Sequence, residues 1–168
     1  MKTMRHLFSV ILAMFCLTAN AQIDHASRSA DGTKYGFVDK NEKWVLEAQW
    51  ETATWDASMQ VGVVGEFKGL KGAVNAKGEF ILPIKYSKIR TNPQSQTLLV
   101  AEERDGSTYW GIFTAEGKPL IPLQFKAVLY DRSKSLFECT TTDDKKIFFG
   151  KDGSPKEQFL TCCLKDES

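Results

Sequence analysis

Apolar residues alternate with polar ones in short stretches that recur along the chain. Alternation with a period of two places the apolar side chains on one face of a β-strand. A first class of stretch comprises residues 46–50, 82–86 and 121–125, and a second class comprises residues 61–64, 98–101 and 136–139. Apart from a short tail near Phe159 and Leu160, no segment has a helical period, so the pattern predicts an all-β fold of about a dozen short strands.

These stretches belong to a repeat. Gly36-Phe37-Val38-Asp39 lines up with the segments that begin at Gly72 and Gly111, and the three glycines are 36 and 39 residues apart. A degenerate fourth copy begins at Ile147, where isoleucine replaces the glycine. A fixed period indicates that each unit buries its apolar face against its neighbours. We therefore expect three to four antiparallel β-hairpin units of about 36 residues over residues 34–163, stacked as a short solenoid or a propeller-like array, open or closed.

The repeat also predicts its own turns and edges. Asn75-Ala76-Lys77-Gly78 has the residues of a type I turn that ends in a left-handed glycine, and Gly117 ends an equivalent turn. In the first copy Glu42 takes the place of this glycine, so we expect a less well formed or differently shaped turn there. Pro83 and Pro122 share one repeat position, and proline cannot donate a ladder hydrogen bond, so this position should lie at an edge, a bulge or a strand end.

The strings Lys34-Tyr35-Gly36-Phe37-Val38-Asp39 and Tyr109-Trp110-Gly111-Ile112 resemble the WG-repeat family. Only Trp110-Gly111 keeps the tryptophan, and the second copy departs from the pattern with Leu70-Lys71-Gly72. The resemblance covers roughly residues 34–155. It implies a β-repeat architecture found in exported and surface-associated bacterial proteins, with a scaffold or binding role, and it transfers no catalytic residue.

The N-terminus has the pattern of a signal peptide. Lys2 and Arg5 precede an apolar run at residues 7–17, which is too short to span a bilayer as a helix, and Ala19 and Ala21 are the small residues that a signal peptidase requires. We expect cleavage after Ala21, and a periplasmic or extracellular mature chain with no transmembrane segment. The expected organisation is a signal peptide at 1–21, a flexible lead-in at 22–33, a WG-type β-repeat domain at 34–163 and a C-terminal tail at 164–168.

Charge restricts the partners of the mature chain. Residues 22–168 contain 20 basic and 21 acidic residues, so the formal net charge of +1 of the whole chain becomes −1. A near-neutral chain lacks the basic excess that nucleic acids or an anionic membrane surface require. The expected partner is a protein or a glycan, no cofactor is expected, and the oligomeric state stays open.

Cysteine is the first chemical candidate. The mature chain keeps Cys139, Cys162 and Cys163, and exported proteins generally fold in an oxidising compartment. A disulfide from Cys139 to either of the other two would stabilise the chain by about 3 kcal/mol through loop closure. Free thiols are the main alternative, and a redox or metal role is a minor one. The odd thiol could stay free or bridge two molecules.

Catalytic and metal-binding patterns are weak. His25 is the single histidine of the mature chain, which disfavours a Ser-His-Asp triad and a histidine zinc site. Asp39 and Asn75 recur by position, and their role in turns is favoured over a calcium site. We therefore expect neither catalytic residues nor a metal site.

Aromatic residues are the remaining candidates. Trp50, Tyr86 and Phe125 share one repeat position and should form the core. Trp55 and Tyr130 recur nineteen residues after the glycine, and Trp44 shares another position with Phe80. Tyrosine and tryptophan on one exposed face suit sugar stacking or a protein interface. The candidate ligand-binding residues are therefore Trp44, Trp55 and Tyr130, and the alternative is aromatic packing between units.

Three functions are consistent with these patterns. The favoured one is an exported, non-enzymatic binding or scaffold module that acts through a repeat face. A cell-envelope hydrolase is the second, and it requires carboxylates in a cleft between units, at least one of them with a raised pKa. A structural envelope protein is the third, and it would self-associate without another ligand.

Overall fold

The computed structural model describes residues 21–156. The predicted signal peptide up to residue 20, Cys162, Cys163, the segment near Phe159 and Leu160, and the predicted tail at 164–168 lie outside the described residues. Within residues 21–156 no helix is long and apolar enough to cross a membrane.

The described chain forms four antiparallel sheets, and in each sheet the strands follow one another in sequence order. Sheet 1 contains β1 (His25–Arg28), β2 (Tyr35–Val38) and β3 (Trp44–Trp50). Sheet 2 contains β4 (Thr52–Asp56), β5 (Val61–Gly65), β6 (Lys71–Asn75) and β7 (Phe80–Tyr86). Sheet 3 contains β8 (Lys88–Asn92), β9 (Thr97–Arg104), β10 (Ser107–Thr114) and β11 (Pro119–Phe125). Sheet 4 contains β12 (Ala127–Asp131), β13 (Leu136–Thr140) and β14 (Lys146–Gly150).

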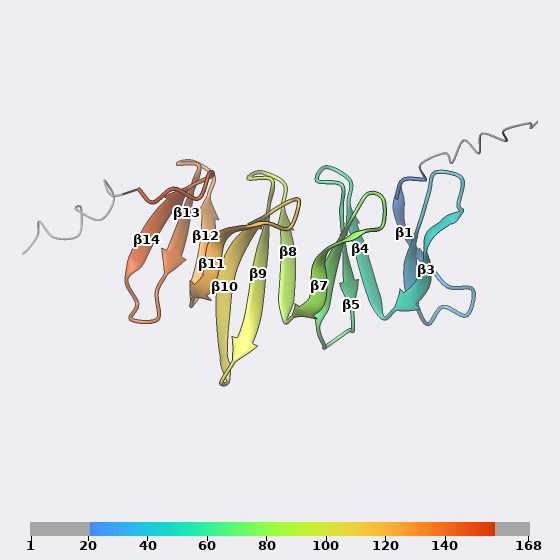
Figure 1. Ribbon diagram of the computed structural model, residues 1–168, viewed down its shortest axis with the longest axis horizontal. Coiled ribbons are helices and arrows are strands. Elements are labelled where there is room, and N and C mark those ends of the chain that lie inside the picture. Colours follow the sequence, from blue (N-terminus) through green and yellow to red (C-terminus); the bar gives the residue numbers. More distant parts are fainter. Residues whose placement is uncertain (1–20, 157–168) are drawn as a thin grey trace, which may run out of the picture.

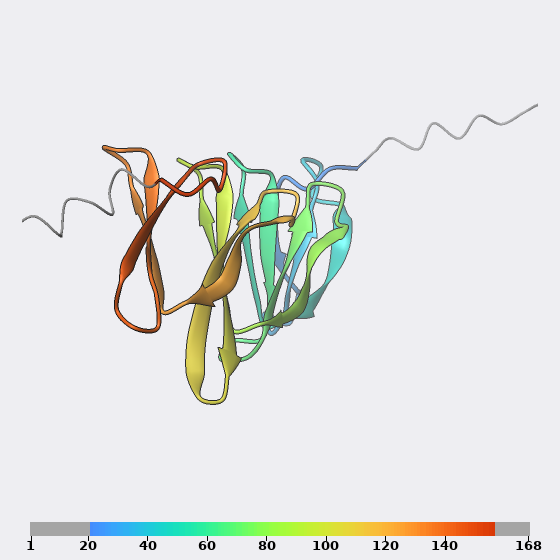
Figure 2. The same cartoon turned by 60° about the vertical axis from the view of Figure 1, so that its left-hand side comes forward.

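The sheets stand in a row, with sheet 1 and sheet 4 at opposite ends (Figure 1). The turned view shows the same succession of sheets from one end to the other (Figure 2). A single residue joins each sheet to the next, because Glu51, Ser87 and Lys126 separate the last strand of one sheet from the first strand of the following one. The predicted all-β repeat fold is confirmed.

Two groups of strands lie where the sequence pattern predicts none. The short first strands β8 and β12 show no regular alternation of apolar residues, and in β4 the alternation is limited to Ala53 and Trp55. In addition, β1 lies within residues 22–33, which were expected to form a flexible lead-in. It pairs with β2 along its whole length, from His25 opposite Val38 to Arg28 opposite Tyr35. Pairing therefore orders a segment that is polar in sequence.

The core consists of three clusters, one at each junction between neighbouring sheets. Side chains on one face of a strand meet those of the next sheet, so each sheet buries apolar residues toward its neighbours. Trp50, Tyr86 and Phe125 are 9%, 5% and 1% exposed, which confirms them as core residues. Ring contacts cross the first junction, where the Phe37 ring lies edge-on to the Trp55 ring with centroids 5.9 Å apart.

The repeated glycine lets the last strand of a sheet pass close to the third. A Cβ atom on Gly111 would lie 2.7 Å from the carbonyl oxygen of Ile121 in β11. The register of β10 against β11 shifts at this point, and β6 against β7 shifts in the same way. Pro83 and Pro122 lie in β7 and β11, the edge strands of their sheets, as their missing N–H group predicts.

The turn glycines make close contacts between sheets. Gly117 has a φ of +79°, and a Cβ atom there would clash with the carbonyl oxygen of Ile81 in the preceding sheet. A Cβ atom on Gly78 would lie 2.9 Å from Leu46, and one on Gly153 would lie 2.8 Å from the Leu120 carbonyl oxygen. In sheets 2 to 4 the turn that follows the third strand therefore lies against the last strand of the sheet before it.

The turn that contains Glu42 differs from the expectation. The first copy was expected to have a poorly formed or altered turn, but Glu42 adopts a φ of 60° and donates its N–H to the Asp39 carbonyl at 3.0 Å. Gly117 makes the equivalent bond to Thr114, also at 3.0 Å. Within residues 21–156 no sheet precedes sheet 1, so a side chain at this position meets no preceding sheet, and the Glu42 carboxylate lies 3.6 Å from His25 Nε2 in β1. The left-handed conformation alone costs a non-glycine residue about 1 kcal/mol, which the turn tolerates.

The contact between sheets can be tested at Gly117. Gly117→Ala should destabilise the chain by about 3 kcal/mol, because it combines left-handed strain with a clash against sheet 2. Gly106→Ala is the matched control, since Gly106 has a φ of +74° with no atom within 4 Å of its added Cβ. It should cost only about 1 kcal/mol. Urea unfolding of both variants gives the two values, and equal losses would contradict the contact.

Candidate functional site

The two long edges of the array differ in how uniform they are. Along one edge lie the turns between third and fourth strands, and their side-chain bonds repeat. Asn75 Oδ1 accepts from the N–H groups of Lys77 at 2.9 Å and Glu79 at 3.0 Å, and Asp39 Oδ1 accepts from the N–H groups two and four residues on. The turn role of Asp39 and Asn75 is therefore confirmed, and it uses their side-chain oxygens.

The opposite edge carries four loops that differ from one another. They connect the second and third strands of each sheet, or β1 and β2 in sheet 1, and they lie along the lower side of the array (Figure 1). Loops on a fixed scaffold are where binding residues concentrate. We call this side the loop edge, and define it by residues 29–34, 66–70, 105–106 and 141–145 with the joint residues Glu51, Ser87 and Lys126.

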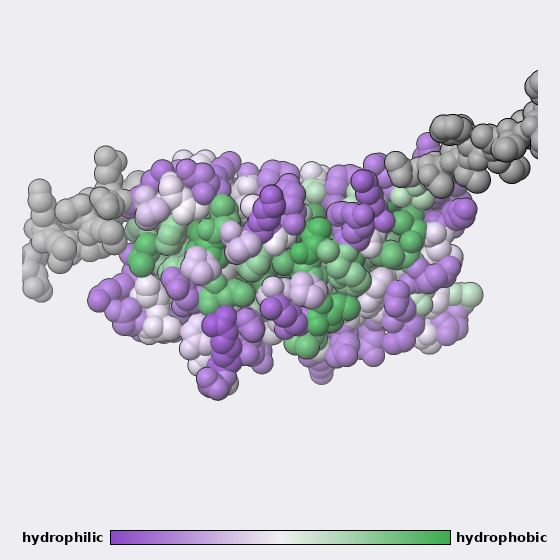
Figure 3. Space-filling view, viewed as in Figure 1, coloured by the Kyte–Doolittle hydropathy of each residue, from purple (hydrophilic) through white to green (hydrophobic). Residues whose placement is uncertain are grey.

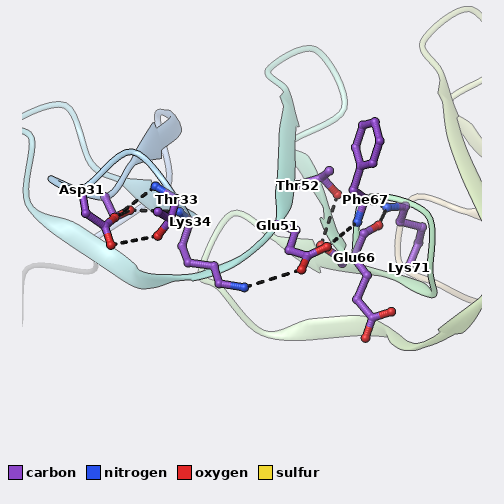
Figure 4. Close-up of polar contacts among 10 residues, drawn as sticks. Asp31, Thr33, Lys34, Glu51, Thr52, Glu66, Phe67 and Lys71 are labelled. Carbon is purple, nitrogen blue, oxygen red and sulfur yellow. Dashed lines mark hydrogen bonds and ion pairs between the residues drawn. The ribbon is translucent and has the colours of Figure 1, made fainter.

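Glu51 contacts both the loop of sheet 1 and the loop of sheet 2. Its carboxylate accepts a hydrogen bond from the Phe67 N–H at 3.0 Å and lies 3.8 Å from the Lys34 ammonium (Figure 4). A bond to a charged acceptor is stronger than a neutral one. The single residue between β3 and β4 therefore fixes the main chain of the loop at 66–70.

Lys71 closes the same loop from its other end. The Lys71 ammonium donates to the Thr52 hydroxyl at 3.1 Å and to the Glu66 carbonyl oxygen (Figure 4). Burial lowers the pKa of Lys71, and the nearby carboxylates of Glu66 and Glu51 oppose that effect. With its backbone held on both sides, the loop presents the Phe67 side chain to solvent, 70% exposed.

Phe67 borders a notch between sheets 2 and 3. The notch has a volume of about 470 Å³, and Leu70, Lys71, Lys88 and Glu103 are among its lining residues. Leu70 is itself 46% exposed. Hydrophobic side chains gather over the lower middle of this face of the molecule, surrounded by polar ones (Figure 3). The notch therefore combines an apolar wall with three lysines, Lys68 included, and one glutamate.

Sheet 2 carries most of the exposed apolar surface. Of the five large hydrophobic residues exposed within residues 21–156, Phe67, Leu70, Phe80 and Ile84 lie in this sheet or its loop, and only Leu129 lies in sheet 4. Scattered exposed apolar residues are ordinary, whereas a local concentration marks an interaction surface. Phe80 begins β7 beside the turn at 75–79, on the opposite edge, whereas Phe67 and Leu70 both lie in the loop at 66–70, which makes the loop edge of sheet 2 the strongest candidate site.

The junction of sheets 3 and 4 has a more polar version of this notch. Tyr109, Lys126 and Thr142 are among the residues that line it, and its volume is also about 470 Å³. Lys126 forms an ion pair with Asp144 at 2.5 Å, so the joint residue again contacts the loop of the following sheet. Both partners are exposed, which limits the contribution of this pair to stability.

The three aromatic residues singled out in the sequence lie apart from one another. Trp55 packs against the first core cluster and also lines a groove of about 460 Å³ with Asp56, Arg90 and Thr91. Tyr130 lies against the third cluster, with its ring 5.0 Å from the Phe137 ring. Trp44 begins β3 opposite Val38 and is partly buried. Trp55 and Tyr130 make local packing contacts, and among the described residues no shared groove joins the three.

Cys139 is a free thiol among the described residues and is fully buried. Burial, with a smaller effect of Glu138, raises its pKa to about 12, so it is unreactive near neutral pH. Its predicted disulfide partners lie outside the described residues, and the disulfide stays a prediction. His25 lies in β1, with Nδ1 3.0 Å from an Asp24 carboxylate oxygen.

The acidic residues give a hydrolase no support. Within residues 21–156 every carboxyl pKa that departs clearly from its ordinary value is lowered. At Asp39 the Lys43 and Asn41 N–H groups cause this shift, and at Glu116 the Thr114 hydroxyl is the main cause. No cluster of three or more metal-ligating side chains occurs in the same part of the chain.

Four meandering sheets joined by single residues define a β-repeat module. The family model described as WG containing repeat matches residues 35–54 and 72–94. These two segments, in the first and second copies, match the WG containing repeat, and the resemblance seen in the sequence is confirmed there. The second match includes the copy that lacks the aromatic-glycine start.

Comparison with curated proteins gives no match. Among solved structures, one described as "Crystal structure of the eukaryotic initiation factor" aligns with a TM-score of 0.47 and 14% sequence identity. The alignment covers 77% of this chain and 37% of that chain.

The Phe67 loop was missed in the sequence, although a signal was present. The copies align from their glycines onward, but residues 66–70 insert Phe67 and Leu70 where the third copy has only Asp105-Gly106. An apolar residue in a connection that the repeat does not require indicates a surface role.

The Glu51 contact predicts a specific change in amide exchange. Glu51→Ala removes the acceptor of the Phe67 N–H, so hydrogen exchange at that amide should rise about tenfold, as expected for losing about 1.5 kcal/mol of a charge-assisted bond. Glu47→Ala, an exposed glutamate in the same β3, is the matched control and should leave the rate unchanged. NMR-detected exchange measures both, and an unchanged Phe67 rate in Glu51→Ala would contradict the contact.

Two loop carboxylates should titrate at low pH. Hydrogen bonds from Ser29 and Thr33 lower the pKa of Asp31 to about 2, and bonds from Thr141 and Lys145 lower that of Asp143 to about 2. A folded-state pKa below the model value of 3.8 means that these bonds stabilise the loops above about pH 4 and are lost as the pH falls toward 2.

Carbon-13 titration of the carboxyl groups measures both midpoints. Ser29→Ala removes the largest cause at Asp31, so the Asp31 midpoint should rise toward its ordinary value while the Asp143 midpoint stays at about 2. If the Asp31 midpoint does not move, the Ser29 bond is not the cause.

Proposed function

We propose that this chain is a non-enzymatic binding module that engages a protein partner through its loop edge, with Phe67 as the central apolar contact. The observation that carries the proposal is that Phe67 is 70% exposed while Glu51 holds its N–H at 3.0 Å. An exposed aromatic residue on a fixed backbone loses little conformational entropy on binding. Aromatic anchors of this kind dominate the energy of protein interfaces.

The surroundings of Phe67 indicate the chemistry of the partner. Lys71 and Lys88 line the notch beside Phe67 and Leu70, with Glu103 as the carboxylate. A partner segment with an apolar side chain next to an acidic one would place the first against Phe67 and the second near the lysines of the notch. Ion pairs at the rim add specificity and association rate more than affinity.

A glycan in the groove at Trp55 is the second candidate. Trp55 lines this groove with Asp56, Arg90 and Thr91, so an aromatic ring stands beside charged and hydroxyl groups that can bind sugar hydroxyls. Phe67 contributes nothing to that groove, so substitutions separate the two candidates. We also propose that the chain acts outside the cytoplasm, on the strength of the signal-peptide pattern at residues 1–21.

The experiment compares three versions of the chain from Gln22 to Ser168, each immobilised at equal density. Extracts of the native host are passed over wild type, Phe67→Ala and the control Leu129→Ala, which removes a side chain that is 65% exposed in sheet 4. Retained proteins are quantified by mass spectrometry. We expect a protein that wild type and Leu129→Ala retain alike and that Phe67→Ala retains at least about tenfold less, because truncating an anchor costs about 2 kcal/mol.

Two outcomes contradict this function. Equal retention by Phe67→Ala and Leu129→Ala would remove Phe67 from the site. Binding to glycans that Trp55→Ala abolishes and Phe67→Ala leaves intact would replace the protein partner with a sugar. Thermal unfolding of each variant ensures that lost binding does not reflect lost folding.

A further inference from the structure

The hairpin of β9 and β10 projects beyond the neighbouring strands of sheet 3. On one side β8 pairs with β9 only as far as Lys88 opposite Ala101. On the other side β11 pairs with β10 only as far as Phe125 opposite Trp110. Residues 102–109 therefore extend past both neighbours, along the lower side of the array (Figure 1). In the other three sheets the corresponding residues form the loops at 29–34, 66–70 and 141–145.

The tip of this hairpin is a two-residue turn. Asp105 and Gly106 both have left-handed φ angles, of 50° and 74°, as a type I′ turn requires. The pair that flanks such a turn, here Arg104 and Ser107, exchanges both of its main-chain hydrogen bonds. Hydrogen-bonded and non-hydrogen-bonded pairs then alternate, so the main-chain groups of the following pair point away from the hairpin.

Glu103 and Thr108 form that following pair. Glu103 therefore points its N–H and C=O groups out of the free edge of β9, and Thr108 does the same at the free edge of β10. Two residues away in β9, the Ala101 carbonyl oxygen points in the same direction and accepts the Ser87 N–H at 2.9 Å. Within residues 21–156 no strand pairs with β9 beyond this bond, so the Glu103 main chain is open to a partner.

The two free edges border different notches. Glu103 lines the notch beside Phe67 and Leu70, so the free edge of β9 has an apolar wall next to it. Thr108 lines the second notch, together with other hydroxyl-bearing residues and Lys126. Open main-chain groups, exposed apolar side chains and lysines therefore come together at the edge of β9.

We propose that a segment of the protein partner adds to the free edge of β9 as a short strand and exchanges two main-chain hydrogen bonds with Glu103. The inference rests on the proposed function, because Phe67 supplies the adjacent apolar contact, and it specifies how the partner binds. In strand addition, main-chain bonds supply affinity and side chains that alternate along the added strand supply specificity. The unpaired groups of an edge strand provide the template.

Pairing with Glu103 sets the spacing of the partner's side chains. Val100 lies in the core cluster between sheets 2 and 3, so Glu102 and Arg104, on the same face of β9, face sheet 2. Glu103 faces the other way, as does the partner residue opposite it. Both neighbours of that residue face sheet 2, where one places an apolar side chain on Phe67 and the other an acidic one near the lysines of the notch. The apolar and acidic residues should therefore be separated by one residue.

The same edge of a second copy is a poor occupant. The projecting part of β9 contains Glu102, Glu103 and Arg104. Antiparallel pairing of two such edges around Glu103 would place two carboxylates directly opposite each other, which is destabilising. Charged side chains on an edge strand disfavour pairing between identical edges. For the same reason the partner residue opposite Glu103 should not be acidic.

A phage-displayed library of random linear peptides supplies the probe. The library is selected on the chain from Gln22 to Ser168, with Phe67→Ala for counter-selection. We expect enriched peptides that carry an apolar and an acidic residue separated by one position, with no proline between them, since proline cannot donate to the Glu103 carbonyl oxygen. The affinity of the most enriched peptide is then measured by isothermal titration calorimetry.

Two proline substitutions on opposite edges test the main-chain bond. Glu103→Pro removes the outward N–H at the β9 edge, and the matched control Thr108→Pro removes the outward N–H at the β10 edge. Edge positions whose N–H faces solvent tolerate proline. Glu103→Ala loses the carboxylate but keeps the N–H. Relative to it, Glu103→Pro should bind the peptide at least about tenfold more weakly, because a peptide carbonyl is left without its donor. Thr108→Pro should bind as wild type does.

Hydrogen exchange measured by NMR gives a second readout on the unsubstituted chain. Saturating peptide should slow exchange at the Glu103 amide at least about tenfold, because that amide becomes hydrogen-bonded. The Thr108 amide, on the edge that stays free, should exchange at an unchanged rate. Thermal unfolding of the two proline variants checks that both hairpins are folded to the same extent.

The outcomes distinguish this inference from the proposed function. If Phe67→Ala weakens binding while Glu103→Pro binds like Glu103→Ala, or if the Glu103 amide stays unprotected, strand addition is wrong and the Phe67 site stands. Equal losses in the two proline variants, or protection at Thr108 instead of Glu103, also overturn pairing at β9. A selection that yields no peptide dependent on Phe67 contradicts the proposed function, and this inference with it.

Discussion

The contact between the turn of one sheet and the last strand of the preceding sheet is the constraint on which the rest of the structure depends. Main-chain hydrogen bonds hold each sheet together, and between sheets a main-chain bond from the Ile23 N–H to the Ala76 carbonyl oxygen adds to the side-chain packing and the turns that set the spacing. At Gly117 there is no room for a Cβ atom beside Ile81. When the turn holds this spacing, the next sheet packs against Trp50, Tyr86 and Phe125 and buries them.

This constraint divides the molecule into two edges with different freedom. The turns of sheets 2 to 4 require glycine, because a Cβ atom at Gly78, Gly117 or Gly153 would meet the preceding sheet, whereas Glu42 in sheet 1 adopts the same left-handed conformation. At the loop edge neighbouring sheets contact each other through side chains, as Glu51 does with Lys34 and Phe67, and the four loops differ in length and composition. Glu51 and Lys126 show how the one-residue joints reach into these loops and fix them. A rigid array thereby presents distinct side chains, with Phe67 the most exposed of the large apolar ones.

The sequence predicts the parts of the fold that recur by position. Period, core aromatics and edge prolines follow from it, because each depends on local spacing and residue type. The first strands and β1 do not, since His25–Arg28 is polar and is ordered only by pairing with β2. The candidate site could not be predicted from the sequence for a similar reason. The position of Phe67 depends on the hydrogen bond from its N–H to Glu51, sixteen residues away. The predicted ligand residues Trp55 and Tyr130 illustrate the converse, because periodicity marks them but cannot separate packing from binding.

The most direct test of this account is whether the turns touch the neighbouring sheets in solution. Nuclear Overhauser effects between the α-protons of the turn glycines and the preceding strands report distances below about 5 Å. The account predicts cross-peaks from Gly78 to Leu46, from Gly117 to Ile81 and from Gly153 to Leu120, with each glycine as close as its missing Cβ implies. If the cross-strand signals within each sheet are present but all three of these contacts between sheets are absent, the sheets are not stacked as described.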